Sequence, residues 1–154
     1  MKNYSVLYGT ETGTAEDLAD DLVKVLAEHG IDIPSTNVDS VSSEVFRDSD
    51  VILMIISTWG DGEPPTDAED FYNEVNALSD GTFSGQFRFA VFGLGDTGYE
   101  LFCQCAKDFD AAFERIGGDR ILPRVDADID YEEPFEGWTK SIGQFCAENR
   151  LLAA

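Results

Sequence analysis

Short apolar runs alternate along the chain with longer segments in which apolar residues recur every three or four positions. The runs are typical of buried strands, and the longer segments are typical of helices that turn one face to a core. The most apolar run covers residues 51–56 and predicts a central strand buried on both faces. The clearest helical repeat covers residues 15–26 and stops before Gly30.

Turn and cap residues indicate where the elements end. Pro34 places the second strand at a sheet edge, because proline cannot donate to a strand ladder. Thr66 and Glu69 have the spacing of a capping box, and Gly117 with Gly118 ends a helix. The predicted strands are residues 4–8, 31–38, 50–57, 87–92 and 120–125. The predicted helices run from 15 to about 29, from 66 to 78, up to 116, and from 135 to 152, with an acidic loop at 126–134.

This alternation predicts an α/β fold in which helices cover both faces of a parallel sheet. Five strands fit the doubly wound order 2-1-3-4-5, a three-layer sandwich. With 154 residues, no internal repeat and no linker, the chain is expected to form one domain over residues 1–154. Ligands of such sheets bind beyond the carboxyl ends of the strands, where the strand order reverses. The loops 10–15, 58–65 and 93–102 are expected to meet there.

The first of these loops reads TETGT over residues 10–14 and opens a helix. Backbone N–H groups at a helix start have no partner within the helix, and the helix dipole adds about half a positive charge. A phosphate is the natural ligand there, and three threonine hydroxyls add donors. The loop has no Lys or Arg, so it does not match the nucleotide-binding P-loop. An ordinary helix start capped by Thr10 or Thr12 is the alternative.

The other two loops each combine glycines with one aromatic residue. Trp59 leaves the central strand, and Tyr99 follows the glycine-rich stretch 93–98. Trp59 is either core packing or one wall of a slot for a flat aromatic ligand, and Tyr99 would be the opposite wall of that slot. The stretch 93–98 matches the dinucleotide pattern GxGxxG, but that pattern belongs to the first strand–helix turn, and Asp96 would repel a pyrophosphate. A dinucleotide is therefore not expected here.

The three loops carry the motifs GTETGTAE at 9–16, STWGDG at 57–62, and FGLGD at 92–96, which is followed by YELFC at 99–103. In this order they resemble the flavodoxin family over essentially the whole chain, and they are similar to the FMN domains of diflavin reductases such as cytochrome P450 reductase. The absence of a long insertion before Asp126 resembles the short-chain flavodoxins. Many flavodoxins have a threonine where Ala15 stands, so one phosphate hydroxyl is missing here.

The resemblance implies that residues 10–15 hold the phosphate of FMN, that Trp59 and Tyr99 enclose its ring, and that the third loop lines the ring's edge. The cofactor-binding residues that it implies are Thr10, Glu11, Thr12, Gly13, Thr14, Ala15, Ser57, Thr58, Trp59, Gly60, Asp61, Gly93, Leu94, Gly95, Asp96, Tyr99, Phe102 and Cys103.

The resemblance further implies a non-enzymatic, low-potential carrier of single electrons that works through the quinone, semiquinone and hydroquinone states of FMN. Its expected partners are a flavodoxin reductase as donor and an oxidoreductase as acceptor. The peptide after Gly60 is expected to rotate and accept a bond from the semiquinone, since glycine permits positive φ. The alternatives are a flavin-dependent NAD(P)H or quinone reductase of the same fold and an accessory protein of one pathway. A receiver-type signalling module is disfavoured, because Ser57 stands where such a module needs an aspartate.

Charge indicates what kind of partner the chain binds. Ten Lys and Arg against 31 Asp and Glu give a net charge of −21. Such a surface repels nucleic acid and anionic membranes and favours basic redox proteins, although solubility or salt adaptation is the alternative explanation. The acidic rim expected to dock a partner consists of Asp61, Glu63, Asp67, Glu69, Asp70, Glu100, Asp126, Asp128 and Asp130.

The remaining expectations concern the state of the chain. No signal pattern and no apolar run of membrane-spanning length occurs, so a cytoplasmic monomer is expected. The three cysteines are an odd number without metal-ligand spacing, which indicates reduced thiols and no metal site.

Overall fold

The computed structural model describes residues 3–58 and 62–153, with side chains as far as Asn149. Its parallel sheet has the order β2-β1-β3-β4-β5, and β6 also pairs with β4. The strands are β1 Tyr4–Gly9, β2 Ser35–Asn37, β3 Val51–Ser57, β4 Arg88–Leu94, β5 Asp119–Arg120 and β6 Val125–Ala127. The helices are α1 Thr14–Glu28, α2 Val45–Asp48, α3 Glu69–Ala77, α4 Gln104–Arg115 and α5 Glu132–Ala153, with short 3-10 turns η1 Val38–Ser40 and η2 Thr66–Ala68. The α/β fold class and the order 2-1-3-4-5 are therefore confirmed.

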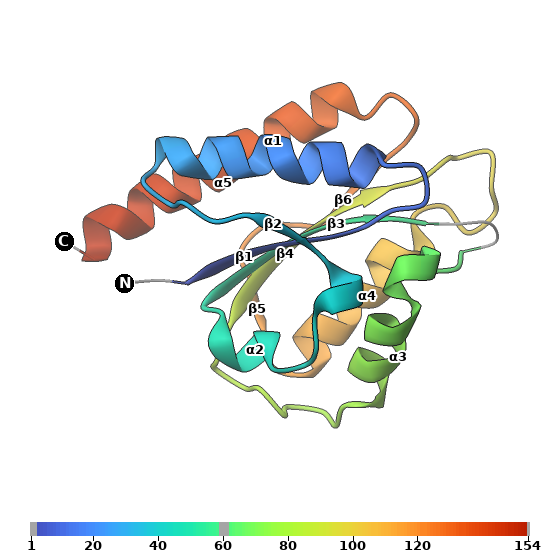
Figure 1. Ribbon diagram of the computed structural model, residues 1–154, viewed down its shortest axis with the longest axis horizontal. Coiled ribbons are helices and arrows are strands. Elements are labelled where there is room, and N and C mark those ends of the chain that lie inside the picture. Colours follow the sequence, from blue (N-terminus) through green and yellow to red (C-terminus); the bar gives the residue numbers. More distant parts are fainter. Residues whose placement is uncertain (1–2, 59–61, 154) are drawn as a thin grey trace.

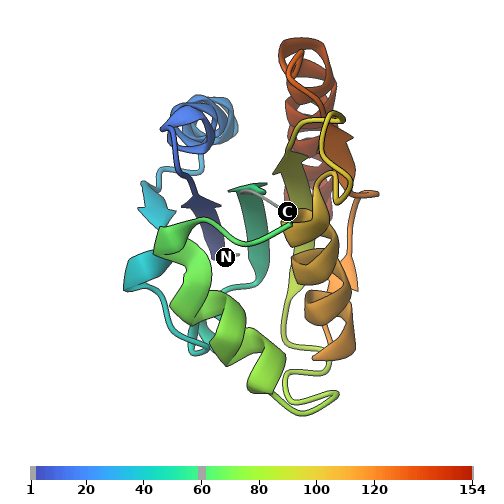
Figure 2. The same cartoon turned by 90° about the vertical axis from the view of Figure 1, so that its right-hand side faces the viewer.

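Helices cover both faces of the sheet. Figure 2 shows α1 and α5 on one side and α3 and α4 on the other. Alternate residues of β3 enter the two cores, with Leu53 and Ile55 toward α1 and α5, and Met54 toward α3 and α4. Residues 51–56 are fully buried, as predicted for a central strand. The three-layer sandwich thus has two separate apolar cores.

Both edges of the sheet are shorter than predicted. At one edge only Ser35–Asn37 joins the ladder, while Ile31 and Ile33 pack against the core beside α1. At the other edge the predicted strand 120–125 is wrong, because two short strands, β5 and β6, replace it. The chain leaves the ladder between them, where Pro123 has no N–H to donate.

Two helix starts and one strand end also differ from the prediction. The predicted capping box of Thr66 and Glu69 is wrong. Thr66 begins η2, and its backbone N–H donates to the Glu11 carboxylate. The last helix begins at Glu132, so Pro134 lies in its first turn, where no N–H is needed. Residues 93 and 94, predicted as loop, are the last residues of β4. The predicted end of the helix at Gly117 is confirmed. Gly117 has a φ of 116°, and the N–H of Gly118 donates to the carbonyl of Phe113.

The chain termini and the carboxyl ends of the strands lie at opposite ends of the sheet. Figure 1 places the start of β1 and the end of α5 at one end, and the carboxyl ends of β1, β3, β4 and β6 at the other. Among the described residues, no helix is both long and apolar enough to cross a membrane.

Candidate functional site

A pocket of about 450 Å³ opens at the carboxyl ends of β1, β3, β4 and β6. This volume lies within the range of about 300–1,000 Å³ that is usual for small-molecule sites. The pocket is lined by Glu11, Thr12, Thr14, Ser57, Thr58, Leu94, Gly95, Asp96, Tyr99, Leu101, Phe102, Cys103, Asp128, Ile129 and Tyr131. The three loops predicted to meet at this edge therefore meet there.

The start of α1 forms one end of the pocket. Gly13 is the N-cap, with φ 93° and no side-chain cap, so the alternative of a helix capped by Thr10 or Thr12 is wrong. The first N–H bonded within the helix is that of Asp17, which donates to the carbonyl of Gly13. The N–H groups of the preceding turn are thus free of helical partners. The hydroxyl oxygens of Thr12 and Thr14 lie 3.4 Å apart beside them.

The remaining residues of this loop hold its shape. Thr10 Oγ1 accepts a bond of 2.8 Å from the Gly13 N–H. The Thr10 N–H donates to the Asp67 carboxylate, which also accepts from Asn37 at 2.7 Å. Thr10, Gly13 and the buried Ala15 are not among the residues that line the pocket.

The second loop is tied to the third at its start. The Thr58 N–H donates to the carbonyl of Leu94 at 3.0 Å, and Thr58 Oγ1 accepts from the Cys105 N–H at 3.1 Å. Ser57 and Thr58 both line the pocket. Trp59, Gly60 and Asp61 lie outside the described residues, so their predicted roles stay predictions.

Cys103 joins three parts of the site. It is the only non-glycine residue with positive φ among the described residues, at 52°, and it is the N-cap of α4. Its Sγ lies 3.7 Å from the carbonyl of Ala127. A Cβ atom at Gly95 would lie 2.9 Å from the same sulfur, so only glycine fits there. Burial raises the pKa of the Cys103 thiol to about 12.

The raised pKa of Cys103 predicts an unreactive thiol. Only the thiolate attacks alkylating reagents, so at pH 8 the folded protein should react at least about 100-fold more slowly at Cys103 than the urea-unfolded chain. Because the folded pKa lies above the ordinary value, the fold should also lose stability as the pH rises above about 8.5. Peptide mass spectrometry after iodoacetamide treatment measures the first effect, and thermal unfolding at pH 7 and pH 10 measures the second. Equal reactivity of the two states would contradict the burial argument.

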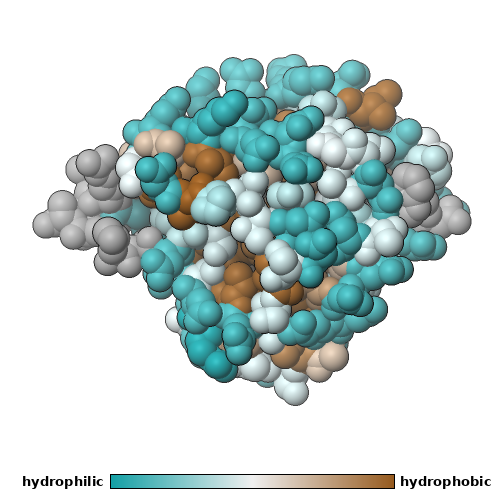
Figure 3. All heavy atoms as spheres, viewed as in Figure 1, coloured by the Kyte–Doolittle hydropathy of each residue, from teal (hydrophilic) through white to brown (hydrophobic). Residues whose placement is uncertain are grey.

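Apolar side chains are exposed at the mouth of the pocket. Tyr99, Leu101 and Ile129 are 54%, 43% and 67% exposed, and they are the only large apolar side chains so exposed among the described residues. All three line the pocket. On the face shown in Figure 3, by contrast, hydrophilic side chains predominate. This exposed apolar surface is what a flat aromatic ligand would cover.

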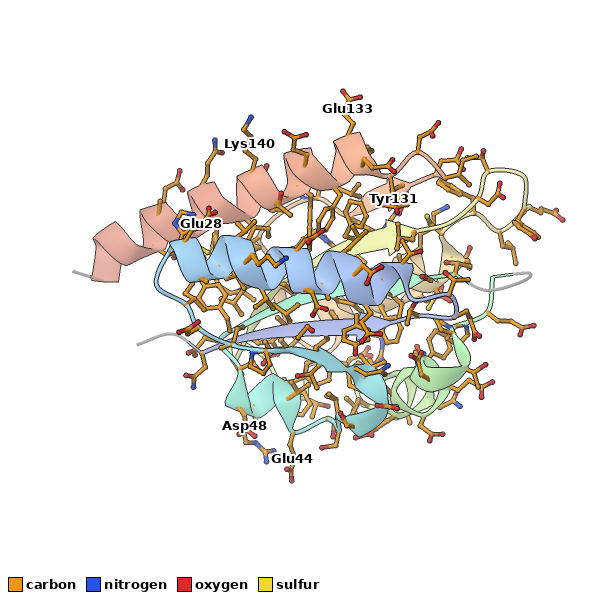
Figure 4. All side chains as sticks on the ribbon, turned by 45° about the horizontal axis from the view of Figure 1, so that its top comes forward. Glu28, Glu44, Asp48, Tyr131, Glu133 and Lys140 are labelled. Carbon is orange, nitrogen blue, oxygen red and sulfur yellow. The ribbon has the colours of Figure 1, made fainter. Side chains whose placement is uncertain are left out.

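One loop that lines the pocket is not predicted from the sequence motifs. Residues 128–131, which follow β6, contribute Asp128, Ile129 and Tyr131 to the lining. Tyr131, labelled in Figure 4, lies just before α5. The sequence predicts an acidic loop here and assigns Asp128 and Asp130 to the docking rim, whereas Ile129 and Tyr131, which are unusual in such a loop, are the signal for a place in the pocket.

An ion-pair network anchors β6 beneath this loop. Arg124 donates to Asp126 at 2.8 Å and to Asp110 at 3.3 Å. Asp110 lies on α4 and is 4% exposed, and it also accepts two bonds from Arg120. A buried carboxylate of this kind requires such partners. The network therefore fixes β6 to α4 at the edge of the site.

Comparison with known proteins gives the family. A sequence model of the flavodoxin family matches residues 6–138. The chain belongs to the flavodoxin family. The solved structure of oxidised flavodoxin 1 from Bacillus cereus has the same fold, with a TM-score of 0.79, 22% identity, and coverage of 95% of this chain and 97% of that one. The flavodoxin of Streptococcus pneumoniae TIGR4 gives a TM-score of 0.77 at 28% identity, with coverage of 94% and 95%.

Longer proteins contain a flavodoxin unit similar to this chain. The sulfite reductase [NADPH] flavoprotein alpha-component of Bacillus subtilis strain 168 is 37% identical over 141 residues, which cover 92% of this chain and 23% of that protein. The protein of the same name from Zymomonas mobilis is 40% identical over 150 residues, covering 97% of this chain and 24% of that protein. The chain thus spans about a quarter of the length of these curated relatives.

Flavodoxins bind FMN, so the cofactor expected from the sequence is the cofactor of this family. The residues present fit it at both ends of the pocket. The α1 start offers uncharged donors suited to one phosphate, and Tyr99 and Ile129 offer exposed apolar surface suited to a flat ring. The Glu11 carboxylate, which would repel the phosphate, is bonded to the Thr66 N–H.

The predicted acidic rim is only partly available to a partner. Asp67, Asp126 and Asp128 are half-buried and accept hydrogen bonds within the fold, so their assignment to an open rim is corrected. Glu63, Glu69, Asp70, Glu100 and Asp130 are exposed. Acidic side chains elsewhere also point outward, as Figure 4 shows for Glu28, Glu44, Asp48 and Glu133.

Proposed function

We propose that this chain is an FMN-bearing electron-transfer unit that passes single electrons between redox proteins. The observation that carries the proposal is the pocket at the carboxyl ends of the strands, which joins an uncapped helix N-terminus to exposed apolar side chains. Bound FMN supplies the one-electron chemistry, and the chain binds, orients and tunes it. Thr12 and Thr14 would hold the phosphate, and Tyr99 would cover one face of the ring, opposite Trp59.

Carboxylates in the lining oppose the addition of negative charge to the pocket. Glu11, Asp96 and Asp128 are among the lining residues. One carboxylate about 10 Å away raises the free energy of an added unit charge by roughly 0.4–1.7 kcal/mol, for effective dielectric constants of about 80 down to 20. Apolar contact with Tyr99 and Ile129 adds to this effect by excluding water. The pocket should therefore favour a low reduction potential.

The exposed carboxylates around the mouth suit a basic protein partner. Glu63, Glu100 and Asp130 are exposed near exposed apolar side chains of the pocket. Charges at the margin of an interface accelerate encounter more than they strengthen the complex. The donor and acceptor are therefore proposed to be redox proteins with basic docking surfaces.

Electron transfer from the reduced, FMN-loaded protein to a basic acceptor such as cytochrome c should fall steeply with salt. The second-order rate constant is expected to drop at least about tenfold between low salt and about 0.5 M NaCl, because salt screens the steering field. Stopped-flow absorbance measures it. Glu100→Gln should lower the low-salt rate, whereas Glu28→Gln, at the far end of α1, should leave it within about twofold. A rate independent of salt would contradict the proposed docking surface.

A second candidate is a flavin-dependent reductase that oxidises NADPH directly. The 37–40% identity to sulfite reductase [NADPH] flavoproteins favours it. Mixing the FMN-loaded chain with NADPH separates a carrier from a direct NADPH oxidoreductase. If the flavin absorbance bleaches only when a separate flavin reductase is added, the chain is an electron-transfer unit. Rapid bleaching by NADPH alone would favour an enzyme that uses NADPH directly.

A further inference from the structure

Two loops of the pocket diverge where the β4–β6 ladder ends. The last paired residues are Leu94 and Ala127, and the Gly95 N–H then donates to the carbonyl of Ala127 at 2.9 Å. Beyond this point one loop carries Tyr99, and the other carries Ile129. Both side chains stand at the mouth of the pocket, so the separation of the two loops determines how widely the pocket opens.

Asp128 joins these loops across 31 residues of sequence. Its carboxylate accepts from the Thr97 hydroxyl at 2.6 Å and from the Thr97 N–H at 3.0 Å. The same carboxylate accepts from the Ile129 N–H at 2.8 Å. These bonds, above all those from Thr97, hold the pKa of Asp128 below its usual range, so the carboxylate is ionised at neutral pH. Bonds to an ionised acceptor are shorter and stronger than neutral ones.

The turn that carries Thr97 is itself held in place. The Asp96 side chain accepts from the Gly98 N–H at 2.7 Å, and the Asp96 carbonyl accepts from the Tyr99 N–H at 3.0 Å. This compact turn transmits the position of Thr97 to Tyr99. A restraint on Thr97 is thus a restraint on the aromatic wall of the pocket.

We propose that Asp128 is a positioning residue for the cofactor, which holds the Tyr99 loop against the Ile129 loop through Thr97 and thereby slows the release of FMN. The inference rests on the proposed binding of FMN in this pocket. Asp128 has two opposing effects there. Its charge repels an anionic ligand, but the half-buried carboxylate still contacts water, which screens that charge, whereas its hydrogen bonds restrain both loops directly. The second effect is expected to dominate.

The test is the rate at which isotopically labelled FMN leaves the protein after excess unlabelled FMN is added, followed by rapid desalting of samples taken at timed intervals. Thr97→Val removes one bond to the carboxylate without changing any charge, and should accelerate release about five- to tenfold. Thr97→Ser restores the hydroxyl and should bring the rate back to within about twofold of wild type. Thermal unfolding of each apo-protein shows that the variants fold.

A pair of carboxylate variants separates positioning from charge. Asp128→Asn and Asp130→Asn remove the same charge from the same loop, but Asp130 makes no hydrogen bond or ion pair among the described residues. Positioning predicts faster release for Asp128→Asn and no acceleration for Asp130→Asn. Release of FMN from Thr97→Val at the wild-type rate would overturn this inference but not the proposed function. Equal changes of the release rate in the two asparagine variants would have the same consequence. A wild-type chain that does not bind FMN would overturn the proposed function and this inference together.

Discussion

Thr14→Asp is expected to lower FMN affinity by at least about 100-fold while leaving the apo-protein at least as stable as wild type. Thr14 is the first residue of α1 and lines the pocket. Two like unit charges about 4 Å apart repel by about 4 kcal/mol at an effective dielectric constant of about 20, which opposes the phosphate strongly. The same carboxylate interacts favourably with the helix dipole, by about 0.3–1 kcal/mol. The fold and the phosphate site thus respond in opposite directions.

Isothermal titration with FMN and urea unfolding of the apo-protein measure these two responses. Thr14→Ser keeps the hydroxyl and is the matched control, with an affinity expected within about threefold of wild type. If Thr14→Asp bound FMN as tightly as Thr14→Ser, the phosphate would not lie at the start of α1. A loss of stability in the apo-protein would instead mean that the helix start depends on the hydroxyl.

Gly117→Ala is expected to lower the free energy of unfolding by about 3–5 kcal/mol. Gly117 has φ 116°, and a Cβ atom there would lie 2.4 Å from both the Cα and the N of Ser84. Backbone strain costs about 1–3 kcal/mol, and overpacking against an atom that cannot rotate away costs about the same again. The expected loss is a large part of the free energy of unfolding, which is typically about 5–15 kcal/mol for a small protein.

Gly85→Ala is the control for the backbone strain alone. Gly85 also has positive φ, at 74°, but nothing lies within 4 Å of its Cβ position. Its replacement should cost only about 1 kcal/mol. Urea unfolding of both apo-variants compares them. Equal losses for the two variants would show that the contact with Ser84 carries no cost.

The sheet order was predictable because the alternation of strands and helices can be read locally and five such strands fit the doubly wound order. Residues 51–56 are apolar at every position, which only a strand buried on both faces explains. The edges were less predictable, since short edge strands depend on partners far away in sequence. The split into β5 and β6 depends on pairing with β4 and on Pro123, and a run of apolar and charged residues from 120 to 125 does not reveal it.

The same distinction holds in the pocket. Each of the three predicted loops carries its own short motif, which can be recognised in the sequence. The loop 128–131 reaches the site only because β6 pairs with β4. Long-range partners also decide the roles of the acidic residues. Glu11 bonds Thr66 across 55 residues, and Asp128 bonds Thr97 across 31. From sequence alone such carboxylates cannot be told from those that face a partner.

Nuclear magnetic resonance titration of the ¹⁵N-labelled apo-protein with FMN shows where on the chain the cofactor binds. We expect saturable changes at one equivalent in the backbone signals of residues 12–16, 57–58, 94–103 and 127–131, which surround the pocket. The signals of residues at the other end of the sheet, such as His29 and Gly143, should not move. Changes centred away from the start of α1 and from Tyr99, or no saturable change at all, would contradict the account.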